Sequence, residues 1–336
     1  MARSTENPWL RRFSFLTAFC TLILICFGGL VTSKGAGLAV PDWPNTYGYN
    51  MFFFPISKWV GGIFYEHTHR LVASGVGLLT TILAVWLWLA ESRALLRWLG
   101  VAAWIAVVVQ GVLGGLRVTQ LKDEIGIFHA SLAQLFFVLV TTIGVLQTGW
   151  WRRLVPAADD AGRFLRLWLG VATGLVLVQL MLGATMRHQH AGLAVPDFPL
   201  AYGRIWPATD ATSIDRYNQT RMEVQASRPI TAAHVWVHML HRVGAVTILA
   251  TVLALAWRAR RRLGAGHSMA KGAAVWGALL LIQAGLGAFS IWTGKSADIA
   301  TAHVAVGSVC LVWGAQVWFT SLRIWPRRQI AGLGGS

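Results

Sequence analysis

The segment Ala36-Gly-Leu-Ala-Val-Pro-Asp42 recurs letter for letter as Ala191-Gly-Leu-Ala-Val-Pro-Asp197, and each copy is followed by an aromatic residue, a proline and then Tyr-Gly. A chance repeat of seven residues is implausible, so the chain contains an internal duplication. The duplication continues in three further pairs: His69-Arg70 with His241-Arg242, Gln110–Gly114 with Gln283–Gly287, and His129 with His303. The sequence therefore predicts two similar halves, residues 1–160 and 161–336.

The composition is that of a membrane protein. Of the 336 residues, 55% are hydrophobic and 12% are charged, about half the charged fraction of a soluble domain. Apolar segments near the spanning length of about 20 residues fall at 13–31, 62–90, 98–116, 125–149, 167–186, 232–257, 272–292 and 299–320. We predict an all-α polytopic membrane protein with eight transmembrane helices in two four-helix bundles. Because each half has an even number of spans, we expect parallel repeats related by a pseudo-two-fold axis along the membrane normal.

The net charge of +16 arises from basic tracts between the apolar segments, a distribution that indicates membrane topology rather than nucleic-acid binding. The tracts follow the even-numbered spans and lie at 93–97, 152–166, 258–271 and 323–328. By the positive-inside rule, these ends and both termini face the cytoplasm. The long segments 32–61 and 187–231 then face outwards.

Four of the ten histidines lie near the outer ends of even-numbered spans, two in each half: His69, His129, His241 and His303. A lone histidine on an apolar helix is more often an interhelical hydrogen-bonding group, but four in duplicated register favour a ligand role. Two imidazoles from facing helices suit a six-coordinate haem iron better than zinc, which usually takes three or four protein ligands. No CxxCH spacing indicates covalent attachment. We predict two haem sites, one per half and both towards the outer face.

Glu66 stands three residues before His69, whereas His238 occupies the corresponding position in the second half. The helical repeat places Glu66, His69 and Arg70 on one face and turns His67 away from it. Two interpretations of Glu66 remain open: a carboxylate that moves protons or stabilises positive charge, and an ion pair with Arg70 at the interface. Arg70 and Arg242 likewise either bind haem propionates or extend to the membrane interface.

Together these residues resemble the haem A synthase family, whose members have eight spans in two similar halves. The family carries an E-x-x-H pair on the second helix and one histidine on each of helices four, six and eight. Glu66, His69, His129, His241 and His303 match this pattern, and the similarity covers nearly the whole chain, including the outer-loop segment 37–44.

The resemblance implies an oxidoreductase of the bacterial cytoplasmic (inner) membrane. Such an enzyme oxidises the methyl group of haem O, its substrate, to the formyl group of haem A for cytochrome oxidase assembly. The resemblance further implies that His69 and His129 ligate the substrate haem iron, with Glu66 catalytic, and that His241 and His303 ligate the iron of a haem b cofactor.

One departure concerns the outer loops, where many bacterial members of this family carry a cysteine pair. The corresponding positions here are Val40 and Thr46 in the first loop and Val195 and Ala201 in the second. No loop disulfide can form, so we expect packing and hydrogen bonds around Asp42 and Asp197 to hold both loops.

Two other functions stay open: a di-haem cytochrome b that only relays electrons, and a haem-binding assembly or transport protein without chemistry. The chain has no flavin, nicotinamide or iron–sulfur motif, so an enzyme of this kind needs an external electron carrier. Haem O synthase is a further expected partner, besides membrane lipid.

Overall fold

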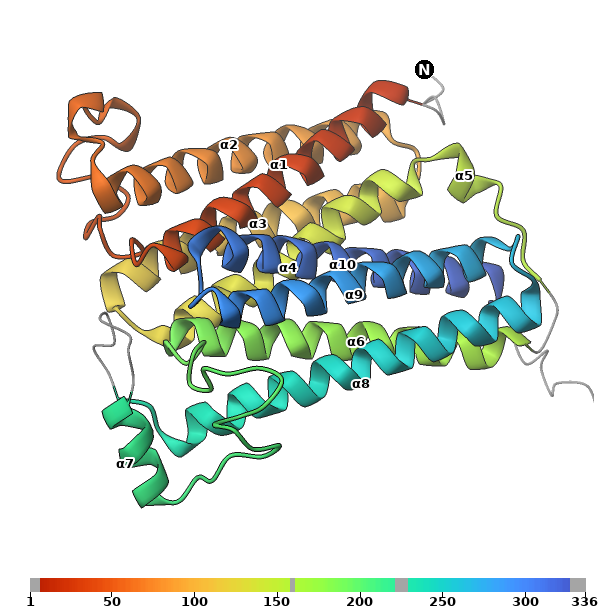
Figure 1. The fold of residues 1–336 in the computed structure, drawn as a ribbon. Coiled ribbons are helices and arrows are strands. Elements are labelled where there is room, and N and C mark those ends of the chain that lie inside the picture. Colours follow the sequence, from red (N-terminus) through yellow and green to blue (C-terminus); the bar gives the residue numbers. More distant parts are fainter. Residues whose placement is uncertain (1–6, 158–160, 221–228, 327–336) are drawn as a thin grey trace, which may run out of the picture.

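Eight long helices run side by side in the computed structural model, which describes residues 7–157, 161–220 and 229–326 (Figure 1). All eight are long and apolar enough to cross a membrane. They are α1 (Pro8–Ser33), α2 (Gly61–Ala90), α3 (Ala94–Gln120), α4 (Asp123–Leu146), α6 (Ala161–His188), α8 (Ala232–Leu263), α9 (Ser268–Trp292) and α10 (Ala297–Ile324). Short helices η1 (Met51–Phe53), η2 (Ile56–Lys58), α5 (Gly149–Arg152) and α7 (Ala211–Thr220) lie in the connections. The predicted all-α multi-pass membrane protein with eight spans is confirmed.

The long helices pack as two groups of four. Helices α1 to α4 contact their neighbours in sequence, and α4 also contacts α1. Helices α6, α8, α9 and α10 repeat this pattern of contacts. The two groups meet where α10 contacts α1 and where α4 contacts α6 and α10. This arrangement is consistent with the predicted parallel repeats; the boundary that we predicted at residue 160 falls on residues 158–160, outside the described ranges.

Buried polar side chains join the helices at specific points. Gln147 Nε2 on the C-cap of α4 donates to Ser14 Oγ on α1 over 2.8 Å. Gln316 Nε2 on α10 donates to Thr142 Oγ1 on α4 over 2.9 Å, which links the two groups. Because lipid offers no hydrogen-bonding partners, such bonds favour one particular packing of the helices.

Most of the long helices extend beyond the apolar segments that predicted them, whereas α4 ends at Leu146, before the predicted residue 149. Two of the extensions have a clear physical reason. Helix α1 begins at Pro8, before the predicted residue 13, because the side chain of Asn7 accepts hydrogen bonds from two N–H groups of the first turn. Helix α8 continues to Leu263, beyond the predicted residue 257, and places Arg260, Arg261 and Arg262 in its last turn. Cations are favourable there because they complement the negative end of the helix dipole.

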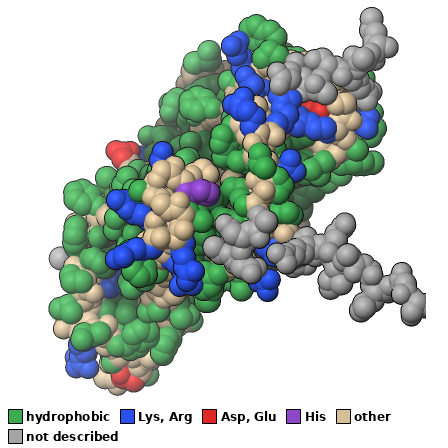
Figure 2. Space-filling view, turned by 90° about the vertical axis from the view of Figure 1, so that its right-hand side faces the viewer, with side chains coloured by type: hydrophobic (Ala, Val, Ile, Leu, Met, Phe, Trp, Pro, Cys, Tyr) green, Lys and Arg blue, Asp and Glu red, His purple; other side chains and the backbone are tan. Residues whose placement is uncertain are grey.

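The two ends of the bundle differ in structure and charge. The described parts of the two long segments, with η1, η2 and α7, gather at the end drawn on the left of Figure 1. The opposite end carries the start of α1, helix α5 and clusters of Lys and Arg side chains with few acidic ones (Figure 2). We refer to these as the loop end and the basic end.

Candidate functional site

The four candidate ligands lie on α2, α4, α8 and α10, in the part of each helix nearest the loop end. The rings of His241 and His303 face each other across 6.4 Å between centroids, at an interplanar angle of 64°. This separation leaves room for one metal ion bound from both sides at about 2 Å per metal–nitrogen bond. His69 and His129 are also close enough to interact electrostatically. The structure therefore brings the predicted ligands together as one pair per half.

Each of these histidines lies against a glycine of the preceding spanning helix. A Cβ atom on that glycine would lie 3.1–3.4 Å from the imidazole Cε1, so the missing side chain makes room for the ring. The four contacts are Gly28 with His69, Gly114 with His129, Gly183 with His241 and Gly287 with His303. We call these glycines the ring seats.

A glutamine four residues before three of the ring seats contacts the same histidines. Gln110 Nε2 donates to the carbonyl of His129 over 3.1 Å, and Gln179 Nε2 donates to that of His241 over 2.7 Å. Gln283 Nε2 lies 3.4 Å from Nε2 of His303. In α1 the same position is Leu24, so His69 alone lacks this contact. His129, His241 and His303 thus each contact a glutamine and a glycine of the adjacent helix. His69 contacts only a glycine.

The sequence analysis recognised only two of these glutamine–glycine pairs, as part of the internal duplication. The pair Gln179 and Gly183 was missed although it has the same spacing, and that spacing was the available signal. Gly28 gave no such signal because Leu24 breaks the pattern.

The ring seats give a direct test of ligand positioning. We expect Gly287→Ala to push the His303 ring by a few tenths of an ångström, since the new Cβ would lie 3.1 Å from its Cε1. Overpacking of this kind typically costs about 1–3 kcal/mol. The reduced absorption spectrum of the bound haem and the haem-to-protein ratio should both change.

The matched control is Gly285→Ala on the same helix, where an added Cβ would meet open space. It should keep the parental spectrum. Equal behaviour of the two variants would show that Gly287 does not position the ligand.

Glu66 and Arg70 form a buried ion pair, with 2.8 Å between Oε1 and Nη2. Arg70 also donates to three carbonyls of the first long loop: Asp42 at 2.7 Å, Val40 at 2.8 Å and Asn45 at 3.0 Å. The second carboxylate oxygen of Glu66 accepts from the Val40 N–H over 3.0 Å. The predicted shared face is present, and so is the interfacial ion pair that was the simpler interpretation. Both side chains anchor the loop to α2.

The second half repeats this anchor without the carboxylate. Arg242 donates to the carbonyls of Val195, Asp197 and Leu200. His238 replaces Glu66; it is buried, and its Nδ1 has no hydrogen-bond partner among the described residues. The contacts of Arg70 and Arg242 thus go to the loops, and their pairing with propionates stays a prediction.

Both loops fold around the repeated aspartate, as expected. The Asp42 carboxylate accepts from the N–H groups of Tyr47 and Gly48, each over 2.8 Å. Asp197 accepts from Tyr202 and Gly203 in the same way. Partial burial alone would raise the pKa of Asp42, but these two backbone hydrogen bonds hold it below its ordinary value.

The positions that correspond to the cysteine pairs are all fully buried: Val40, Thr46, Val195 and Ala201. His67 turns away from the Glu66 face, as predicted, but it is also completely buried under the first loop. Its Nδ1 lies 3.2 Å from Thr46 Oγ1, and its ring packs against Phe54 and Trp59. Side-chain packing thus fills the space of a disulfide in the first loop.

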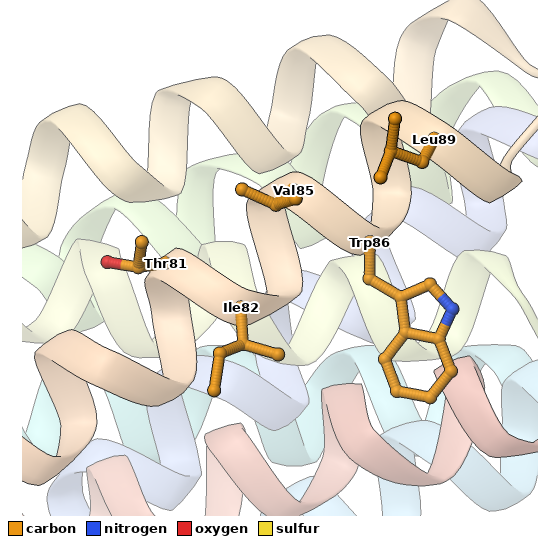
Figure 3. Close-up of a pocket in the computed structure, with 5 residues that line it drawn as sticks. All are labelled: Thr81, Ile82, Val85, Trp86 and Leu89. Carbon is orange, nitrogen blue, oxygen red and sulfur yellow. The ribbon is translucent and has the colours of Figure 1, made fainter.

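A groove on α2 lies apart from these sites. It is lined by Thr81, Ile82, Val85, Trp86 and Leu89, nearest the basic end (Figure 3). Val85 lies about 160° around the helix from His69, so the groove faces away from the histidines. Its lining is almost entirely apolar and carries no group suited to chemistry.

Within the described ranges, no group of three or more His, Cys, Asp or Glu residues could hold a metal ion. Two-histidine sites of this kind fit a metal that brings further ligands of its own, as haem iron does.

Comparison with known proteins gives a consistent result. The model of the COX15-CtaA family, described as "Cytochrome oxidase assembly protein", matches residues 53–315. A protein named Heme A synthase from Geobacillus kaustophilus is 26% identical over 305 residues, covering 88% of this chain and 86% of that protein. The protein of the same name from Bacillus cereus is 25% identical over 310 residues, 88% of each chain. A third, from Alkalihalophilus pseudofirmus, is 30% identical over 207 residues, 59% of this chain and 66% of its own.

Proposed function

This chain belongs to the COX15-CtaA family of cytochrome oxidase assembly proteins, and from that membership we propose that it is a membrane haem A synthase. It oxidises the methyl group of haem O to the formyl group of haem A, and so acts as an oxidoreductase on a CH group. The observation that carries this function is the presence of two histidine-pair sites in one chain, of which only one has a buried carboxylate beside it. A protein that only relays electrons needs no such difference.

The first half, residues 1–160, binds the substrate through His69 and His129. The second half, residues 161–336, holds haem b through His241 and His303. The ring seats and the 6.4 Å separation of the second pair support this assignment. When bound there, haem b would supply a one-electron redox centre. Three needs remain: an external electron carrier, a supply of haem O from its synthase, and O₂ or water as the source of the inserted oxygen atom. All three are met from outside this chain.

Glu66 is the proposed catalytic residue. Converting a methyl to a formyl group removes electrons and protons from one carbon, and positive charge develops as electrons leave. Both oxygens of Glu66 already accept hydrogen bonds, from Val40 and Arg70. Taking up a proton would neutralise the carboxylate and weaken its ion pair with Arg70, whereas stabilising a positive charge would keep that pair. The contacts therefore favour electrostatic stabilisation over general base catalysis.

The orientation that we propose places the basic end in the cytoplasm, with both termini, and the histidine pairs towards the outer face of the bacterial inner membrane. The clusters of Lys and Arg at that end support it (Figure 2). We expect a cysteine at Phe53, whose side chain is 80% exposed in the first loop, to react with a membrane-impermeant maleimide in intact cells. A cysteine at Arg153 should react only after permeabilisation.

The parent chain, with its three intramembrane cysteines, gives the background labelling in both conditions. The reverse pattern of labelling would invert the topology.

Haem analysis of the purified protein tests the function itself. Expression with a source of haem O should yield one firmly held haem b together with variable haem O or haem A, identified by pyridine haemochrome spectra and mass analysis. Two equal, tightly bound haems b and no haem A would instead indicate the di-haem cytochrome. Bound haem O that is never converted would indicate a carrier without chemistry.

A further inference from the structure

Two partly buried arginines that the sequence analysis left unassigned lie beside the histidine pairs. Arg117 on α3 follows the ring seat Gly114 by three residues, and Arg187 on α6 follows the ring seat Gly183 by four. At 1.5 Å per residue, they lie roughly 4.5 Å and 6 Å nearer the loop end than their glycines. Each half thus has an arginine one helical turn outward from an iron-ligand candidate.

The electrostatic neighbours of these arginines include the histidine pairs and His188, which interacts with both arginines. Arg117 also interacts with Glu66 and Asp123. Arg117 interacts with both His69 and His129. Arg187 interacts with His303. Apart from their shared neighbour His188, the two guanidinium groups thus interact with different histidine pairs, one per half.

Arg187 is incompletely satisfied by protein groups. It donates through Nη2 to the carbonyl of Gly29 and to Ser33 Oγ on α1, and its Nε is buried without a hydrogen-bond partner among the described residues. No ion pair between Arg187 and a carboxylate is present in the described part of the chain. A buried cation within a membrane is costly unless an anion accompanies it, so these observations point to an anionic ligand.

Arg117 occupies a space that glycines keep open. A Cβ atom on Gly37 would lie 2.8 Å from Arg117 Nη1, and one on Gly126 would lie 2.9 Å from its Nε. Its Nη1 donates to the Gly37 carbonyl over 2.8 Å. The first loop and α4 therefore leave room for the guanidinium between them, next to His129.

We propose that Arg187 binds a propionate of the resident haem and that Arg117 binds a propionate of the substrate haem. The inference rests on the proposed function, since it requires a macrocycle at each histidine pair. A guanidinium is suited to the task because it binds a carboxylate through two parallel N–H groups. Arg70 and Arg242 each use both Nη groups for loop carbonyls, whereas Arg117 and Arg187 each use one Nη group for protein acceptors. The Nε of Arg242, like that of Arg187, is buried without a hydrogen-bond partner among the described residues.

The test compares a porphyrin that has free carboxylates with one that does not. Haem-free protein in a His69→Ala background, which leaves only the second site, is titrated with iron protoporphyrin IX and with its dimethyl ester. We expect Arg187→Gln to weaken binding of the free acid by about 10- to 100-fold, as for loss of a charge-assisted hydrogen bond, and to leave binding of the ester unchanged. The Arg187→Gln variant should therefore no longer bind the free acid more tightly than the dimethyl ester.

Arg166→Gln is the matched control, because Arg166 lies at the basic end of the same helix and donates to the Trp325 carbonyl. It should keep the preference for the acid. Arg242→Gln should also keep it; if it abolished the preference instead, Arg242 would be the propionate ligand and the inference would be wrong. Equal weakening of acid and ester by Arg187→Gln would show a purely structural role.

The same comparison in a His241→Ala background tests Arg117 at the first site. If the proposed function is wrong and the histidines bind no haem, a variant that lacks both histidine pairs should still bind the free acid with parental affinity. This outcome differs from failure of the arginine assignment alone. Loss of binding on removing the histidines, together with parental behaviour of Arg187→Gln, would overturn only the arginine assignment.

Discussion

His241→Ala strips the resident haem b from the purified protein: this is the largest effect that we expect. The substitution removes one of the two axial ligands that we propose, and the partner His303 faces it across a space suited to a single metal ion. The haem-to-protein ratio, measured by pyridine haemochrome, should fall from about one to near zero, because a bis-histidine haem depends on both ligands for its tight binding.

His69→Ala, in contrast, should keep haem b and lose affinity for the substrate haem. His190→Asn is a suitable surface control, since His190 is exposed in the second loop and has a φ of 55° that asparagine tolerates. Retention of haem b by His241→Ala and its loss from His69→Ala would reverse the assignment of the two halves.

The second large effect concerns Glu66→Gln, which keeps the shape of the side chain and removes its charge. We expect this variant to retain haem b and to accumulate haem O or a hydroxylated intermediate, with haem A formation slowed about 10²–10³-fold, as for loss of one electrostatic stabiliser in other enzymes. The measurement is mass analysis of the extracted haems, expressed per resident haem b so that unfolded protein does not contribute.

Glu91→Gln is the matched control, because Glu91 is also buried and also paired with an arginine, Arg93, at 2.8 Å, but at the basic end of α2. It should form haem A at the parental rate. Arg70→Gln separates charge from loop anchoring, since it releases the loop carbonyls and leaves the carboxylate in place. If Arg70→Gln and Glu66→Gln reduced the rate equally, Glu66 would serve only to hold the loop.

The sequence was sufficient to predict the eight spans and the pairing of the histidines. Span length follows from the thickness of the membrane, and the duplicated register of His69 and His241 fixes which helices correspond. The helix ends were less predictable because Asn7 and the arginines of α8 extend the helices by capping and dipole interactions that hydropathy does not register.

The loop anchors could not be predicted because they join residues far apart in the chain. Arg70 reaches carbonyls 25 to 30 residues earlier, and backbone acceptors leave no trace in a sequence. Arg117 and Arg187 were overlooked for a related reason: isolated arginines near helix ends usually mark the membrane interface. Only their position one turn beyond a ring seat distinguishes them.

The first-loop anchor also constrains the path by which a macrocycle enters the protein. Lifting the loop from α2 would break the three carbonyl bonds of Arg70 and the Val40 bond to Glu66 together. The carboxylate would then lose its position at the moment of substrate entry. Passage sideways from the lipid, between helices, leaves all four bonds intact. A substrate as hydrophobic as haem O already resides in the bilayer, so lateral entry requires neither opening of the loop nor a crossing of the aqueous phase.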